Sequence, residues 1–323
     1  MGIGPPYPPS PVIRAVEWAP PEQILRLARG KGGDGSDNWP LAWAEDDALY
    51  TAYGDGYGFD PPLEEKLGLG FGKILGTPPH LQAINIRSNG ENRGMGPRGI
   101  KASGLLAIGG TLYMWLRNAG NSQLAVSRDA ARTWTMCDWR FTESFGCPTF
   151  LHFGKGYAGA RDEYVYVYSH DADSAYEPAD RMVLARVPSD KLLDRSAYAF
   201  FQALDADGNP IWTRSVTQRG AVFTHPGKCY RSGITYNPGL RRYLWCHTVL
   251  TGSDARFRGG LAIYDAPEPW GPWTTVFYTE EWDVGPGETS SLPTKWMSRD
   301  GRTCHLVFSG NDNFSIRAVR FIT

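Results

Sequence analysis

Hydrophobic and polar residues alternate in five aromatic-rich runs along this chain, and each run follows a turn. Such alternation predicts β-strands rather than helices. The runs recur at intervals of about 50 to 80 residues, enough for four strands of five or six residues with their turns. They lie at residues 49–55, 112–118, 164–169, 243–247 and 304–309. The pattern therefore predicts an all-β protein, a five-bladed β-propeller built from four-stranded antiparallel blades.

The whole chain of 323 residues is assigned to this single propeller domain, because large all-β architectures often reach such a length as one unit. Residues 1–33 form an N-terminal tail, in which a strand near 12–18 could complete the last blade and close the ring. Short helical segments are expected at 21–29 and 189–199. The blades are expected at about 37–86, 98–140, 145–202, 220–280 and 286–323.

One turn carries a recognisable marker of the fold. Residues 127–134, Ser-Arg-Asp-Ala-Ala-Arg-Thr-Trp, resemble the "Asp box" hairpin of sialidase-type propellers, with Ala131 in place of the glycine. Aspartates in turns commonly accept hydrogen bonds from the backbone that follows them. We therefore assign Asp129 to turn structure and not to catalysis.

Composition narrows the classes of partner. The 12 Trp, 16 Tyr and 14 Phe residues suit packed blades and also sugar-stacking surfaces, while a formal net charge of -1 supplies no general attraction to nucleic acid. No apolar stretch approaches the ~20 residues that span a bilayer, so no membrane partner is expected. The N-terminal residues show no secretory signal, and a secreted or periplasmic location would require that one had been removed. The oligomeric state is left open.

No motif in the sequence demands a cofactor. No two of the five cysteines lie at Cys-x-x-Cys spacing, which argues against a zinc ribbon. No glycine-rich phosphate loop with a following Lys-Ser/Thr occurs either. We therefore expect no required cofactor and no protein-bound metal site, although an ion such as calcium could occupy the central channel of a propeller.

The candidate site comes from the starts of the inner strands, which a propeller gathers around one axis. These starts are unusually polar or rich in glycine, and aromatic residues lie close to them in sequence. Flat aromatics contact sugar faces, and polar side chains bind hydroxyl groups, so the set is typical of a carbohydrate site. The residues predicted to bind substrate are Trp39, Tyr57, Lys101, Tyr230, Arg231 and Glu288.

Two aspartates are the predicted catalytic pair. Asp37 opens the first inner strand and Asp55 ends the next strand, 18 residues later. In an antiparallel hairpin, the start of one strand and the end of the next lie at the same edge. Hydrolysis of a glycosidic bond needs such a pair, in which one acid protonates the leaving oxygen and one carboxylate acts as base or nucleophile. The competing interpretation is that both are ordinary turn aspartates.

The segment from Asp37 through Leu-Tyr-Thr-Ala-Tyr-Gly-Asp55 resembles the first blade of a bacterial family formerly of unknown function. That family includes glycoside hydrolases with endo-D-arabinanase activity on mycobacterial arabinan. The resemblance implies a five-bladed propeller, and it implies that Asp37 and Asp55 correspond to the family's two essential aspartates. This chain departs from the family after the Gly-Asp pair, where Gly-Tyr-Gly replaces Thr or Ser and an aromatic residue.

Three functions remain open at this stage. The first is a glycoside hydrolase acting on a polysaccharide or oligosaccharide, with arabinofuranosides among the candidate substrates. The second is a polysaccharide lyase acting on a uronate-containing glycan, for which Tyr230, Arg231, His225 and Lys101 could serve. The third is a propeller that binds carbohydrate without cleaving it.

Overall fold

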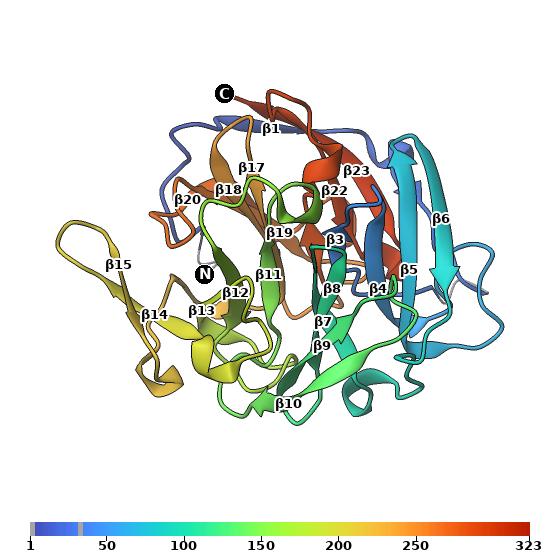
Figure 1. The fold of residues 1–323 in the computed structure, drawn as a ribbon. Helices are drawn as coiled ribbons and strands as arrows, with labels where there is room; N and C mark the ends of the chain where they lie inside the picture. The colour runs from blue at the N-terminus through green and yellow to red at the C-terminus, as the bar shows by residue number, and fades with distance from the viewer. Residues whose placement is uncertain (1–3, 32–34) are drawn as a thin grey trace.

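The computed structural model describes residues 4–31 and 35–323. Five antiparallel four-stranded units stand around a central axis (Figure 1), which confirms the predicted β-propeller. Within the described ranges there is no α-helix, and the only helical segments are single 3₁₀ turns, none of them long and apolar enough to cross a membrane. They are η1 (Pro21–Gln23), η2 (Gly96–Arg98), η3 (Lys155–Tyr157), η4 (Arg195–Ala197), η5 (Val216–Gln218), η6 (Thr294–Trp296) and η7 (Gly310–Asp312).

The first two blades are regular four-stranded meanders. Blade one runs from the inner to the outer strand as β3 (Leu41–Trp43), β4 (Leu49–Gly56), β5 (Leu67–Thr77) and β6 (His80–Ile86). Blade two follows as β7 (Lys101–Ile108), β8 (Thr111–Arg117), β9 (Ser122–Ser127) and β10 (Thr135–Phe141). The Asp-box turn joins β9 to β10, and Asp129 accepts hydrogen bonds there from Ser127 and Thr133.

Blades three and four are joined into one continuous sheet. Blade three contains β11 (Thr149–His152), β12 (Tyr164–His170), β13 (Ala179–Pro188) and β14 (Ala199–Leu204), and β15 (Pro210–Thr213) extends it into a hairpin that projects from the body (Figure 1). Blade four contains β17 (Ser232–Asn237), β18 (Arg242–Val249), β19 (Gly260–Ala266) and β20 (Thr274–Thr279). The inner strands β11 and β17 pair in parallel, Leu151 opposite Ile234, and so connect the two blades.

Blade five joins the two ends of the chain. It contains β21 (Ser290–Ser291), β22 (Thr303–Phe308) and β23 (Ser315–Ile322), and its outer strand is β1 (Ala15–Trp18), which pairs antiparallel with β23. A further short strand, β2 (Leu25–Arg26), also pairs with β23. The N-terminal strand therefore closes the ring.

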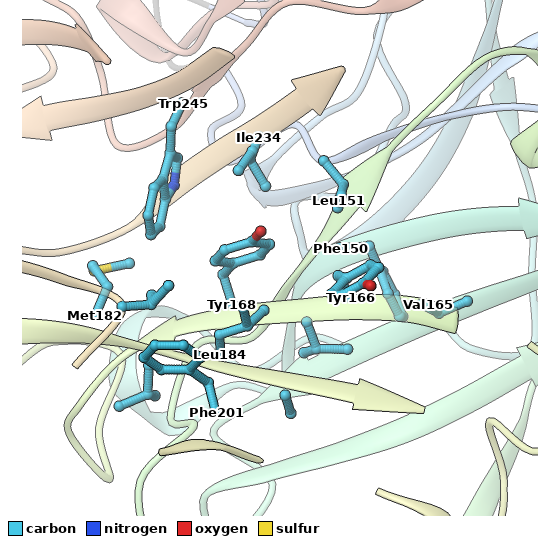
Figure 2. Close-up of a cluster of buried hydrophobic side chains, with 14 of the residues drawn as sticks. Phe150, Leu151, Val165, Tyr166, Tyr168, Met182, Leu184, Phe201, Ile234 and Trp245 are labelled. Carbon is cyan, nitrogen blue, oxygen red and sulfur yellow. The ribbon is translucent and has the colours of Figure 1, made fainter. Parts of the chain in front are cut away.

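Aromatic side chains fill the spaces between blades. Most residues of β12 are buried on both faces of its sheet, because a neighbouring blade covers each face. Figure 2 shows Tyr168 of β12 facing Trp245 of β18, with ring centroids 4.8 Å apart. The Tyr168 hydroxyl donates a hydrogen bond to the Pro269 carbonyl at 2.7 Å, so the polar end of this buried ring is satisfied.

Three segments differ from the sequence expectation. The two expected helices are replaced by η1 with β2 at residues 21–26, where Leu25 and Arg26 pair with β23, and by η4 at Arg195–Ala197. Strand β16 (Phe223–Cys229), which we assigned to blade four, pairs instead with β13 of blade three. Blade four therefore begins at Ser232, after Arg231.

Candidate functional site

A cavity of about 270 Å³ opens where the inner strands of the blades begin. Blades one, two, four and five contribute its charged residues, and a loop of blade three contributes an aromatic ring. It is lined by Asp37, Asp55, Lys66, Met95, Gly96, Lys101, Arg117, Tyr176, Arg256, Glu288 and Asp312. Four of the predicted site residues are in this set, and Arg231 joins them through its contact with Glu288.

Asp37 is fixed to the neighbouring strand by its backbone. Its N–H donates to the Gly54 carbonyl at 3.0 Å, and its carbonyl accepts from the Gly54 N–H at 2.8 Å. The side chain is partly exposed, and Oδ1 is buried without a hydrogen-bond partner among the described residues. Burial, followed by the negative charge of Glu288, raises the pKa of Asp37 to about 7. A large part of the Asp37 population therefore keeps its proton at neutral pH.

Asp55 lies one residue beyond Gly54 and has a different environment. Its backbone adopts φ +43°, in the left-handed region that is uncommon for residues other than glycine. The Lys101 ammonium donates to its Oδ1, and the Gly96 N–H donates to its Oδ2 at 3.0 Å. Every one of these bonds is donated to Asp55, which suits an ionised carboxylate, since that form only accepts.

Lys101 starts β7, and its side chain is 2% exposed. Besides Asp55, its ammonium contacts the Gly68 carbonyl at 3.1 Å. A buried ammonium of this kind is held in place by its charged partner. Lys101 therefore fixes Asp55 at the cavity wall and is not free to bind substrate by itself.

Glu288 also lines the cavity, at the entry to blade five. Its backbone N–H donates to the Ser309 hydroxyl at 2.8 Å, and Arg231 donates to its Oε2. Burial alone would raise the pKa of Glu288, but the guanidinium groups of Arg231 and Arg117 outweigh it and lower this pKa. Glu288 is therefore an ionised third carboxylate, 28% exposed to the cavity.

Three predicted substrate-binding residues lie outside the cavity wall. Trp39 is 2% exposed and belongs to the core, where its ring stacks on Phe59 with centroids 5.0 Å apart, so the sugar-stacking role predicted for it is wrong. Tyr57 is partly buried under the ammonium of Lys31, 5.2 Å from its ring centroid. Tyr230 packs behind Arg231, with the guanidinium carbon 5.0 Å from its ring centroid.

Several residues of the cavity wall were missed from the sequence, and Arg117 and Tyr176 are two of them. Arg117 ends β8 and pairs with Lys101 at the start of β7. That is the relation between strand start and strand end by which we selected Asp37 and Asp55, so the same rule applied to blade two would have found Arg117. Tyr176 lies in the loop between β12 and β13, and no periodicity places a loop residue.

In the described parts of the chain, no three His, Cys, Asp or Glu side chains are grouped so that they could hold a metal ion. The ion that could occupy the central channel stays a prediction.

Comparison with known proteins identifies the fold. A candidate hydrolase from Bacteroides ovatus superposes with a TM-score of 0.54 at 11% identity over 94% of this chain and 93% of its own. The RS223 β-xylosidase gives 0.52 at 13% identity over 94% and 95% of the two chains. A candidate glycosidase from Bacteroides thetaiotaomicron gives 0.50 at 12% identity over 98% and 97%. No protein-family model and no curated protein sequence matches the chain. The chain shares the five-bladed propeller fold of these structures along nearly its whole length.

Proposed function

We propose that this protein is a glycoside hydrolase that cleaves a polysaccharide or oligosaccharide with Asp37 and Asp55 as its acid–base pair. The observation that carries the proposal is the difference between the environments of these two carboxyl groups in one cavity. Burial raises the pKa of Asp37 to about 7, so that a part of its population is protonated near neutral pH, while Asp55 only accepts hydrogen bonds. Pairs of carboxyl groups whose environments separate their protonation states are typical of glycosidases.

The roles follow from these environments. Asp37 protonates the glycosidic oxygen as the bond breaks, and Asp55 acts as the carboxylate that activates water or attacks the sugar. Lys101 holds Asp55 in place through their ion pair. The fold shared with a β-xylosidase and a candidate glycosidase supports a carbohydrate substrate. The resemblance of the segment from Asp37 to Asp55 to endo-D-arabinanases makes arabinofuranosides the first substrates to try.

The lyase alternative has less support. Of its four residues, Tyr230 and His225 lie outside the cavity wall, and Lys101 is engaged by Asp55. A lyase would also release an unsaturated product with its own ultraviolet absorbance, whereas a hydrolase releases only new reducing ends. A non-catalytic propeller would bind sugars without releasing either.

The test is a panel of polysaccharides and aryl glycosides, arabinofuranosides included, assayed for reducing ends. On the substrate found, Asp37→Asn and Asp55→Asn should each lose about 10²–10⁴ in rate. Asp129→Asn, in the peripheral Asp-box turn, is the matched control and should keep its activity. Glu288→Gln tests whether Glu288 replaces Asp55 as the partner of Asp37. Full activity in Asp37→Asn would refute the proposal, and release of unsaturated sugar would favour the lyase.

A further inference from the structure

Two buried arginines, Arg117 and Arg231, meet beside Glu288 at the wall of the cavity. Arg117 comes from the end of β8 in blade two, and Arg231 comes from the residue before β17 in blade four. Both side chains are 1% exposed. Guanidinium groups stay charged in proteins, and burying them is unfavourable unless anionic or hydrogen-bonding partners surround them.

The described part of the chain supplies only some of these partners. Arg231 donates from Nε to the Ala175 carbonyl at 3.0 Å and from Nη1 to Glu288, but its Nη2 has no hydrogen-bond partner there. Arg117 is less well satisfied. Its Nη2 lies 3.9 Å from Oε2 of Glu288, and its Nε and Nη1 have no partner among the described residues. One carboxylate thus faces two guanidinium groups.

The other carboxyl groups of the cavity do not complete the cluster. Asp55 is bound to Lys101, and Asp312 is bound to Arg256 at 3.2 Å. The pKa of Asp37 is raised to about 7, so near neutral pH this group carries only part of a negative charge. Leaving a buried charged donor unpaired is more unfavourable than leaving a neutral one unpaired. Water or a ligand must therefore complete the hydrogen bonding of these arginines.

Tyr176 fixes the orientation of both groups. Its ring centroid lies 5.2 Å from the guanidinium carbon of Arg117 and 4.9 Å from that of Arg231, and the ring itself lines the cavity. Stacking of this kind restricts the planar fork of an arginine and thereby prepares it to bind an oxyanion with two N–H groups. A site for neutral sugar hydroxyls alone does not need two such forks.

We propose that Arg117 and Arg231 form an anion subsite, and that the sugar bound in this cavity carries a carboxylate or phosphate group. The inference rests on the proposed function and narrows its substrate to an acidic glycan. The oxyanion lies beside Tyr176 and takes the N–H groups that Glu288 leaves free. The glycosidic bond of the same sugar then lies toward Asp37 and Asp55, which line the same cavity.

The test uses the intact protein and four soluble probes: glucuronate, galacturonate, glucose 6-phosphate and glucose. Binding is measured by calorimetry and by the rise in Tm, at low and at high salt. At least one anionic probe should bind ten-fold or more tightly than glucose, with an affinity that falls as salt increases. Preference for the uronates or for the phosphate decides which oxyanion the subsite takes.

Variants separate the arginine fork from general charge. Arg117→Gln should weaken binding of the anionic probe ten-fold or more and leave binding of glucose unchanged. Arg117→Lys keeps the charge but loses the fork, and it serves as the second variant if Arg117→Gln fails to fold. Arg256→Gln is the matched control, because Arg256 lines the same cavity but its guanidinium is already paired with Asp254 and Asp312.

The outcomes distinguish this inference from the proposed function. The anion subsite is refuted if no anionic probe binds better than glucose. It is also refuted if the Arg117 variants bind the anionic probe as tightly as wild type does. Cleavage of a neutral glycan under those conditions would leave the hydrolase intact. Binding that depends on Arg117, with no glycan of the panel cleaved, would support the subsite and count against hydrolysis.

Discussion

Substituting alanine for Gly54 tests the geometry of the acid–base pair while both aspartates stay in the sequence. Gly54 lies in β4 with an ordinary negative φ, so its backbone would accept alanine. A Cβ atom added there would lie 2.4 Å from Oδ1 of Asp37, while the next contacts, to Cγ of Asp37 and Cδ of Lys101, are 3.5 and 3.6 Å. The carboxyl group of Asp37 is therefore the single obstacle.

The size of the effect follows from that distance. An ordinary contact begins at 3.4 Å, so the Asp37 carboxyl must retreat by about 1 Å. The backbone of Asp37 cannot follow, because two hydrogen bonds hold it to Gly54 itself. A displacement of ~1 Å at a catalytic group can cost about 10²-fold in rate. Overpacking lowers the free energy of unfolding by roughly 1–3 kcal/mol. Alanine partly offsets this loss, because the unfolded chain has less conformational freedom with alanine than with glycine.

The assay compares kcat, its pH profile and Tm for wild type, Gly54→Ala and the control Gly259→Ala. The nearest atom to a Cβ at Gly259 is 3.5 Å away, so the control should behave as wild type. A displaced and better hydrated Asp37 should ionise more easily, and the alkaline fall in activity should move to lower pH. A Gly54→Ala variant with wild-type kcat and an unchanged pH profile would refute the idea that Asp37 acts from this position.

Three further outcomes are expected. Because the folded-state pKa of Asp37 is raised from 3.8 to about 7, its contribution to stability is present below pH 3.8 and lost as pH rises through 7. Asp37→Asn should therefore have a higher Tm than wild type at pH 8 and a smaller Tm difference at pH 4. An equal Tm difference at the two pH values would contradict the raised pKa. Trp39→Ala should lower the free energy of unfolding by roughly 3–5 kcal/mol, since it empties a core position, as denaturant titration can check. Asp129→Ala should lower Tm, because Thr133 and Ser127 lose their acceptor, and leave kcat unchanged.

The sequence predicted the architecture because period-two alternation and turn chemistry are local signals that survive in the folded state. It also placed Asp37 and Asp55 together, since pairing in a hairpin brings strand start and strand end to one edge. It misjudged Trp39, because lying near a strand start does not reveal whether a side chain points to the cavity or to the next blade. The pairing of β16 with blade three depends on contacts between distant segments, which no local pattern encodes.

The closure of the ring has a consequence for how the protein is made. Ala15 of β1 pairs with Ile322 of β23, about 300 residues away along the chain, and contacts of such large sequence separation form slowly. During synthesis β1 emerges first and must wait for the last strand of blade five before it finds its partner. Over that interval β1 has no partner, and until it pairs with β23 the outer edge of the final blade is open; an open strand edge is a template for pairing with other chains. Removing β1 should therefore make refolding yield fall steeply as protein concentration rises.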